Sequence, residues 1–373
     1  MKVPLFDIAA QNQVFGERLL ASVRRVVESG RFILGREVAR FEREAARFLG
    51  ASYAVGCSSG SDALVLALQA LGVGPGDEVV TTPFSFFASV ESILRVGARP
   101  RFVDIHNDTF ALDPNGLEAA LTPRTRAILG VHLYGCPGAV EAWRAAADAA
   151  GLPLIEDAAQ AFGARSAKRA LGTFGQVGCF SFQPTKPLGA WGDAGLVVTD
   201  DAELAARLAR LRTHGASSKH LHEEAGGNYR LDAVQAAVLA EKLDSLPNFL
   251  TARKERAEAY DAAFVGLAAL STPPRPAGAD QSYALYTVRV TDGRRDALAR
   301  FLAEHGIETA VHYPLPLHRQ PALLALGLGL DWTALPNAER AAEQVLSLPL
   351  YPELSFDQLD HVARTVRQFF EAP

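Results

Sequence analysis

Short apolar runs alternate with longer amphipathic patterns through most of this 373-residue chain. Such alternation predicts an α/β fold in which a mostly parallel sheet is covered by helices on both faces. A sheet buried on both sides has continuously apolar strands, as these runs are. The expected strands are Tyr53–Gly56, Glu78–Thr82, Arg101–Asp104, Ala127–His132, Leu154–Glu156, Gly178–Phe182 and Leu196–Thr199. The expected helices between them are Ser61–Leu71, Phe87–Val96, Asn115–Leu121, Ala139–Ala150 and Asp201–Arg212.

The pattern changes after about residue 232, where a stretch over 231–264 is rich in Ala, Leu, Lys, Arg and Glu. Pro247 interrupts it, so we expect two helices or one kinked helix. These features predict a large domain over residues 1–245, with an N-terminal arm, and a smaller α+β domain over residues 246–373. Further expected elements are a helix at Glu17–Ser29, a loop over 272–280, a strand at Tyr283–Val290, and helices at Arg294–His305 and Leu354–Phe370.

Composition indicates a soluble globular protein, with 49% hydrophobic and 21% charged residues. The net charge of −5 argues against a nucleic-acid or membrane-surface protein, which would have a basic excess. No apolar stretch is long enough to span a bilayer, and the first residues do not form a signal peptide. Cys57, Cys136 and Cys179 are odd in number and far apart, which indicates reduced thiols. We therefore expect a cytoplasmic protein.

Familiar nucleotide and hydrolase motifs are missing from the sequence. There is no G-x-G-x-x-G after the first strand, no G-x-x-x-x-G-K-[ST] and no G-x-S-x-G. None of the nine histidines has a spacing typical of a zinc site, so we expect no metal. The chemistry must therefore be sought in less conspicuous features.

One such feature is the junction Cys57-Ser58-Ser59-Gly60-Ser61-Asp62-Ala63, which joins an expected strand to an expected helix. Ser61 or Asp62 can cap the helix, and Gly60 lets the backbone approach a ligand closely. Unpaired N–H groups in the first turn of a helix favour a phosphate. A plain helix cap explains the same residues equally well.

Two acids, Glu156 and Asp157, follow the apolar run that ends at Ile155. Carboxylates at the end of a buried strand need partners, and ligands bind at this edge of an α/β sheet. An acid there could hold a cationic ring nitrogen. A helix cap or a salt bridge is the alternative.

Lys186 follows an aromatic run and lies among Pro and Gly in Phe180–Gly189. Desolvation lowers the proton affinity of a lysine, and a neutral amine is what imine chemistry requires. Alone, Lys186 could equally be an inert loop lysine. Together, the three features predict a pyridoxal phosphate site, with the phosphate on the helix start and Ser181, the ring nitrogen on Asp157, and an imine at Lys186.

The sequence strongly resembles the DegT/DnrJ/EryC1/StrS family of sugar aminotransferases, within the aspartate aminotransferase superfamily, over nearly its whole length. The resemblance is carried by FILGREVARFE (32–42), SSGSDAL (58–64), GVGPGDEVVTTPFSFFAS (72–89), VDIHNDTFALDP (103–114), TPRTRAILGVHLYG (122–135), IEDAAQAFGA (155–164), FSFQPTKPLGAWGDAG (180–195), GNYRLDAVQAAVL (227–239), VHYPLPLH (311–318) and LSLPLYPEL (346–354).

The resemblance implies a pyridoxal phosphate-dependent transferase of fold type I that works as a homodimer with shared active sites. It implies that Lys186 is the Schiff-base lysine and that Asp157 pairs with the pyridine nitrogen. It further implies that Gln160 contacts the phenolic oxygen and that Phe86 stacks on the ring. The phosphate contacts would be Gly60, Ser61, Ser181 and, from the other protomer, Asn228. Arg230, His312 and Tyr313 would lie near the nucleotide-sugar.

The implied reaction moves an amino group from L-glutamate to a keto-sugar linked to a nucleotide, either dTDP or UDP. Such a reaction serves amino-sugar biosynthesis for a surface polysaccharide or a glycosylated metabolite. The segments Lys186–Gly189 and Gly192–Gly195 resemble those of family members that aminate C3 of the sugar, which favours amination at C3. The alternatives are a C4-specific aminotransferase and a regulatory or binding member of the fold without catalysis.

Overall fold

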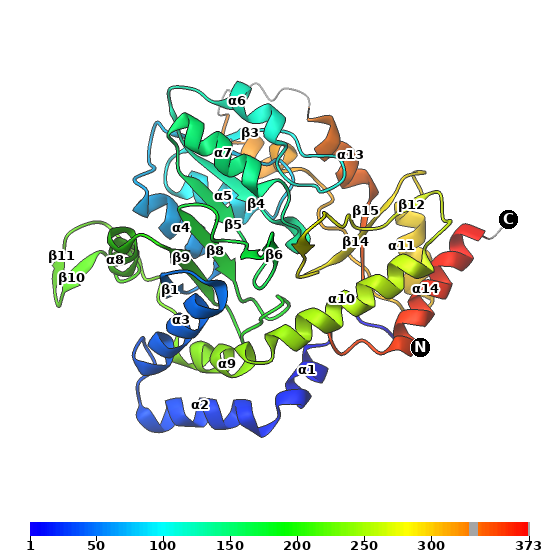
Figure 1. Ribbon diagram of the computed structural model, residues 1–373, viewed down its shortest axis with the longest axis horizontal. Coiled ribbons are helices and arrows are strands. Elements are labelled where there is room, and N and C mark those ends of the chain that lie inside the picture. Colours follow the sequence, from blue (N-terminus) through cyan, green and yellow to red (C-terminus); the bar gives the residue numbers. More distant parts are fainter. Residues whose placement is uncertain (328–334, 372–373) are drawn as a thin grey trace.

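The computed structural model describes residues 1–327 and 335–371. Its centre is a seven-stranded sheet in the order β1-β9-β8-β5-β4-β2-β3, surrounded by helices (Figure 1). The strands are β1 (Tyr53–Cys57), β2 (Glu78–Thr81), β3 (Arg99–Phe102), β4 (Thr125–Val131), β5 (Leu154–Asp157), β8 (Val177–Ser181) and β9 (Gly195–Thr199). All neighbours are parallel except β9, which runs antiparallel to both β1 and β8. The predicted mostly parallel α/β sheet is confirmed.

Side chains alternate between the two faces of this sheet and build two separate cores. Ile128 and Leu154 belong to one core, with α3 (Arg36–Leu49), α7 (Val140–Ala150) and α9 (Ala233–Leu243). Leu129 and Ile155 belong to the other, with α4 (Gly60–Ala70), α5 (Ala88–Arg95) and α8 (Ala202–Leu211). The period of two in a strand is the cause, and it explains why the strands read as continuous apolar runs.

Some expected boundaries were wrong. The strand expected at Arg101–Asp104 is β3, Arg99–Phe102, and it tolerates Pro100 because β3 is the edge strand. The helix expected at Asn115–Leu121 is a 3-10 turn, η1 (Pro114–Gly116), followed by the single turn α6 (Leu117–Ala120).

Pro247 does not break a helix. It lies in the first turn of α10 (Leu246–Ala263), where its missing N–H has no intrahelical partner to lose. The expectation of two helices over 231–264 is therefore the one confirmed, with α9 ending at Leu243.

A second, three-stranded sheet in the order β12-β14-β15 is formed by the C-terminal part of the chain. Its core draws on residues 257–366 and also on Val3, which bridges to Ile307. The N-terminal end therefore lies on the same side as the C-terminal helix α14, at the right of Figure 1. The elements that build this core include β12 (Leu270–Ser271), β14 (Tyr286–Val290), β15 (Val345–Leu348), α11 (Arg295–Glu304) and α14 (Phe356–Glu371). By contrast, α13 (Pro336–Gln344) packs into the core of the large sheet that contains α4, α5 and α8. The short elements η3 (Leu317–Arg319) and α12 (Pro321–Leu324) pack against Val90 of α5.

The N-terminal arm consists of α1 (Ile8–Phe15) and α2 (Glu17–Ser29), which run along the bottom of the view below α9. The predicted helix at Glu17–Ser29 is confirmed. A hairpin formed by β10 (Ala216–Ser218) and β11 (Leu221–His222) projects at the left of Figure 1, at the end of the molecule opposite α14. The remaining short elements are η2 (Leu133–Gly135), β6 (Arg165–Ser166), β7 (Arg169–Ala170) and β13 (Ala279–Asp280).

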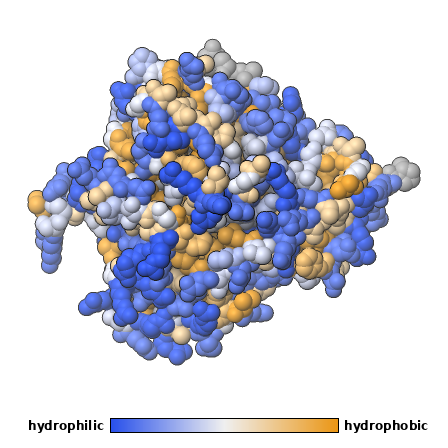
Figure 2. Space-filling view, in the orientation of Figure 1, coloured by the Kyte–Doolittle hydropathy of each residue, from blue (hydrophilic) through white to orange (hydrophobic). Residues whose placement is uncertain are grey.

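The surface is largely hydrophilic in the view of Figure 2, with apolar areas between the charged ones. Among residues 1–327 and 335–371, no helix combines the length and the apolar character that crossing a membrane would require.

Candidate active site

A cavity of about 430 Å³ opens where β4, β5 and β8 end, beside the start of α4. Ligands of open α/β sheets bind at this edge. Of the site residues predicted from the sequence, this cavity is lined by Gly60, Ser61, Phe86, Asp157, Gln160, Ser181, Lys186, His312 and Tyr313.

Asp157 is the last residue of β5, and only 5% of it is exposed. Its Oδ2 accepts a hydrogen bond of 2.7 Å from Ser89 on α5, and its Oδ1 accepts one from the amide of Ala159. Burial raises the pKa of Asp157, while these two hydrogen bonds and the charge of Lys186 oppose the rise. A cation held against this carboxylate would lower its pKa again and keep it ionised.

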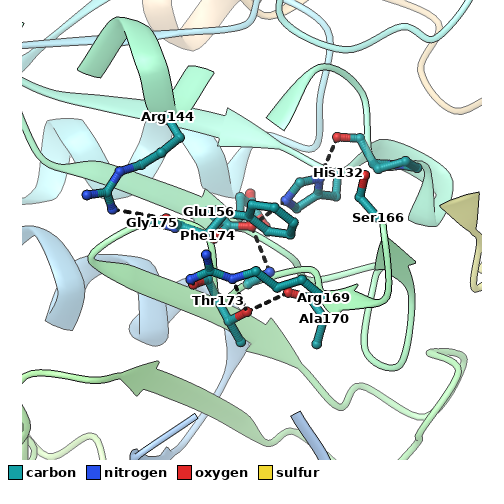
Figure 3. Close-up of polar contacts among 12 residues, drawn as sticks. His132, Arg144, Glu156, Ser166, Arg169, Ala170, Thr173, Phe174 and Gly175 are labelled. Atoms are coloured by element: carbon teal, nitrogen blue, oxygen red, sulfur yellow. Dashed lines mark hydrogen bonds and ion pairs between the residues drawn. The ribbon is translucent and has the colours of Figure 1, made fainter. Parts of the chain in front are cut away.

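Glu156 precedes Asp157 in β5, so it lies on the opposite face of the strand, and it does not line the cavity. Figure 3 shows Glu156 among its polar contacts with His132 and Gly175. Its Oε2 lies 2.8 Å from Nε2 of His132 and accepts the amide of Gly172 at 2.7 Å. Its Oε1 accepts the amide of Gly175 at 2.6 Å. Glu156 is therefore a fully buried acid held by His132 and by two backbone amides, so the structural alternative raised for the Glu156–Asp157 pair describes Glu156.

Lys186 lies in the loop between β8 and β9 and reaches the same cavity as Asp157. Desolvation lowers the pKa of its amine to about 8, although the charge of Asp157 pulls the pKa upward. A much larger share of Nζ is consequently neutral near pH 7 than in an exposed lysine. This is the property that a nucleophilic amine needs.

The start of α4 differs from the prediction in one respect. Ser59, and not Ser61 or Asp62, is the N-cap, because its hydroxyl accepts the amide of Asp62 at 3.1 Å. The amides of Gly60 and Ser61 have no carbonyl acceptor within the helix, as in the first turn of any α-helix. A Cβ added at Gly60 would lie 2.6 Å from Cβ of Ser181, so the glycine brings the two segments together. This cradle fits a phosphate.

The carboxamide of Gln160 is oriented by Tyr134. The backbone amide of Tyr134 donates to Oε1 of Gln160 at 2.5 Å. The Nε2 end of the carboxamide is a donor and faces the cavity, where a hydrogen bond with Gln160 lowers the pKa of Tyr313 against the upward effect of burial. Ser282 fixes the same segment by donating to the backbone carbonyl of Gln160 at 2.6 Å.

Phe86 and the adjoining pair His312–Tyr313 form one wall of the cavity. Phe86 is 59% exposed and its ring centroid lies 6.1 Å from that of Tyr313. Nδ1 of His312 lies 2.9 Å from Oγ of Ser347, and the hydroxyl of Tyr134 donates to the carbonyl of His312. Burial and the charge of Lys186 lower the pKa of His312 to about 4, so its ring is neutral at physiological pH.

Asn228 and Arg230 do not line this cavity in the single chain. Asn228 is exposed and pairs through its backbone with Thr213, while Arg230 pairs with Cys57 at the end of β1. The expectation that Asn228 reaches the phosphate of another protomer, and that Arg230 meets the nucleotide-sugar, stays a prediction.

Ser89 and His132 contribute to the site and were missed from the sequence. Ser89 is buried on α5 and contacts a carboxylate 68 positions away, and His132 lines the cavity beside Asp157. His132 directly follows β4, so its position at the end of a strand was a signal that could have singled it out. No local pattern distinguishes Ser89 from Ser92, the other buried serine of α5.

The residues present fit pyridoxal phosphate. The first turn of α4 and Ser181 form a cradle for its phosphate, and Asp157 is a buried acid that lines the same cavity. Lys186 is a desolvated amine in the same cavity. Among the described residues, no group of three or more His, Cys, Asp or Glu side chains could hold a metal ion.

Comparisons with known proteins also indicate an aminotransferase. The model of the DegT/DnrJ/EryC1/StrS aminotransferase family matches residues 13–367. The chain is 43% identical to a pleiotropic regulatory protein of Geobacillus stearothermophilus, over 99% of both chains. It is 41% identical to the UDP-N-acetyl-3-dehydro-alpha-D-glucosamine 3-aminotransferase of Acidithiobacillus ferrooxidans, over 98% of this chain and 97% of that one.

It is also 44% identical to the dTDP-3-amino-3,4,6-trideoxy-alpha-D-glucose transaminase of Streptomyces venezuelae, over 99% of this chain and 97% of that one. Among solved structures, S. venezuelae DesV in complex with a ketimine intermediate matches with a TM-score of 0.96 at 44% identity. That match covers 100% of this chain and 99% of the other.

Proposed function

The chain belongs to the DegT/DnrJ/EryC1/StrS aminotransferase family, and from this premise we propose that it transfers the amino group of L-glutamate to C3 of a nucleotide-linked keto-sugar. The observation that carries the proposal is the meeting of a desolvated lysine, Lys186, and a buried acid, Asp157, in one cavity beside an unpaired helix start.

Pyridoxal phosphate, when bound, supplies a ring that accepts the negative charge left at the donor's α-carbon when a proton is removed. Asp157 would hold the ring nitrogen in its cationic form, because the negative charge of a nearby carboxylate favours the protonated state of a base. Nζ of Lys186 removes the proton from the donor's α-carbon as a general base, which its lowered pKa permits near neutral pH. Gly60, Ser61 and Ser181 hold the phosphate, while Gln160 and Phe86 orient the ring.

The choice of C3 is supported by the two relatives whose printed names place the amino group there, one with a UDP-sugar and one with a dTDP-sugar. We keep both nucleotides in the proposal. L-glutamate as donor, and a homodimer in which Asn228 completes the partner's phosphate site, follow from the family resemblance. The exposure of Asn228 in the single chain is compatible with such sharing.

We also propose that the chain has a large cofactor-binding domain over residues 1–245 and a small domain over residues 246–373. We further propose that the protein is cytoplasmic. The separate core that draws mostly on residues 257–366 supports the division. Three buried cysteines without a disulfide among them support a reducing compartment.

A regulatory role without catalysis is the second candidate, favoured by the relative described as a pleiotropic regulatory protein. The intact pair Lys186–Asp157 argues against it, since a purely regulatory protein has no need for a desolvated amine beside a buried acid. The two candidates differ in a simple observable. Purified protein with pyridoxal phosphate should absorb visible light, and borohydride should abolish that absorbance.

The decisive experiment compares wild type with Lys186→Ala in a glutamate-dependent assay on a panel of 3-keto and 4-keto nucleotide-sugars. We expect the variant to lose turnover by at least about 10³-fold, since it lacks both the attachment amine and the general base. Lys254→Ala is the matched control, because Lys254 is exposed on α10. NMR of the product identifies the aminated carbon. Undiminished turnover by Lys186→Ala would overturn the proposal, and amination of 4-keto sugars alone would overturn C3.

A further inference from the structure

Lys242 is a lysine buried outside the cavity described above. It lies in the last turn of α9, and only 1% of it is exposed. Its Nζ donates to the backbone carbonyl of Gly189 at 2.9 Å and to Oε1 of Gln11 at 3.0 Å, and it lies 5.9 Å from the ring centroid of Phe15. Both acceptors are neutral. A buried ammonium is expensive, so packing alone would favour an apolar side chain here.

Gly189 belongs to the loop that carries Lys186. A Cβ at Gly189 would lie 2.3 Å from the carbonyl oxygen of Pro184, so the segment 184–189 forms a tight turn around the reactive lysine. The amide of Lys186 donates to the carbonyl of Gln183 at 2.8 Å, which closes the other side of the turn. The hydrogen bond from Lys242 to the carbonyl of Gly189 therefore holds the turn that carries Lys186.

Helix α9 holds this loop at two points. Oε1 of Gln235 accepts the amide of Trp191 at 2.9 Å, and Lys242 binds Gly189. Gln235 and Lys242 are seven residues apart, which places them on one face of the helix. Gly189, the loop residue that Lys242 contacts, is closer in sequence to Lys186 than Trp191, the residue that Gln235 contacts.

The N-terminal helix α1 holds the loop from the other side. Gln11 is 6% exposed and accepts from Lys242, and Oδ1 of its neighbour Asn12 accepts the indole N–H of Trp191 at 2.8 Å. The ammonium of Lys242 thus joins three parts of the chain that lie far apart in the sequence, namely α1, α9 and the loop of Lys186. Desolvation lowers the pKa of Lys242 to about 8, and the charge of Glu353 opposes this shift.

We propose that Lys242 is a positioning residue whose ammonium ties the loop of Lys186 to α9 and to the N-terminal helix, and so sets the place from which the Lys186 amine acts. The proposal rests on the function proposed above only where Lys186 is called the reactive amine. A displacement of about 1 Å in a reacting group can cost about 10²-fold in rate, so a tether of this loop has a catalytic consequence.

The test compares wild type with Lys242→Met, which keeps the length and volume of the side chain and removes its donors. Lys254→Met on the neighbouring helix α10 is the matched control, since Lys254 is exposed and its ion pair with Asp280 spans 3.8 Å. The first measurement is hydrogen exchange in cofactor-free protein. We expect the amides of Lys186 and of residues 188–191 to exchange about tenfold faster in Lys242→Met, with those of β4 and β5 unchanged.

The second measurement is the pH titration of the visible absorbance in protein loaded with pyridoxal phosphate. We expect the midpoint to move by at least about half a pH unit in Lys242→Met, and kcat to fall about tenfold with KM for glutamate nearly unchanged. Lys254→Met should match wild type in every readout. A role confined to global stability would instead speed exchange throughout the protein and leave the absorbance midpoint in place, and that result would overturn the proposal.

Gln11→Leu provides a second variant in case Lys242→Met does not fold, since it removes one acceptor and leaves the lysine. The same changes in smaller degree would support the proposal, and unchanged exchange and midpoint would refute it. Absence of visible absorbance and turnover in wild type would refute the proposed function instead, while the exchange measurement would still test the tether.

Discussion

The hydroxyl of Ser89 donates a 2.7 Å hydrogen bond to Oδ2 of Asp157, and both side chains are buried. This bond lowers the pKa of Asp157 against the upward effect of burial. The ionised form of Asp157 therefore depends on a helix, α5, that is remote from β5 in the sequence.

Replacing Ser89 by Ala should raise the pKa of Asp157, because a donor to the charged form is lost. The protonated acid then persists to higher pH, so the acid limb of the kcat profile should move upward. We expect the acid limb to move by about 1–2 pH units, since a hydrogen bond to a charged group contributes about 1.5–3 kcal/mol. Ser92→Ala on the same helix is the control, because the Ser92 hydroxyl donates only to the carbonyl of Ser89. An unmoved acid limb would contradict the assignment.

The lowered pKa of Lys186 predicts how cofactor-free protein takes up pyridoxal phosphate. The attachment rate should rise with pH and level off above about 8, the pKa to which desolvation lowers this amine. Asp157→Asn should move the midpoint to lower pH, because the charge of Asp157 raises the pKa of Lys186. Stopped-flow absorbance measures both effects. A rate that still climbs near pH 10 would show an ordinary, solvated lysine.

The buried acid Glu156 should matter for stability, since three donors converge on it. Its removal leaves His132 and the amides of Gly172 and Gly175 unpaired. We expect Glu156→Ala to lower the free energy of unfolding by about 3–5 kcal/mol, the usual cost of breaking a buried pair. Urea denaturation measures this change. Asp360→Ala, which removes an exposed pair with Arg364, should have almost no effect. Equal effects of the two variants would argue against the buried network.

A side chain at Gly60 should weaken cofactor binding. The added Cβ would lie 2.6 Å from that of Ser181, so the phosphate cradle must open. We expect Gly60→Ala to raise the Kd of pyridoxal phosphate about tenfold, and to lower the thermal stability of the cofactor-free protein slightly because Ser181 must shift. Gly74→Ala is the control, since its Cβ would meet nothing closer than 4.0 Å. Fluorescence titration of cofactor-free protein gives the Kd, and equal values for the two variants would refute the cradle.

The strands and helices that carry the site could be predicted from the sequence because their signals are local. Apolar runs of the right length mark β4, β5 and β8, and Lys186 stands out by the Pro and Gly residues around it. The helix start at Gly60 was recognisable, yet its cap was misassigned. Ser59, Ser61 and Asp62 all have capping side chains, and the choice between them depends on where the backbone leaves β1.

The sequence by itself determined that two acids end a buried strand and that a lysine follows another strand. Only the tertiary structure decided which acid faces which partner. Asp157 lies on the face of Ile155, toward α5 and the cavity, whereas Glu156 lies on the face of Leu154, toward His132 and the core beyond. Strand alternation fixes that the two acids point in opposite directions. The helices packed against the sheet decide on which of its faces the cavity lies, and these helices come from residues tens of positions away in the sequence.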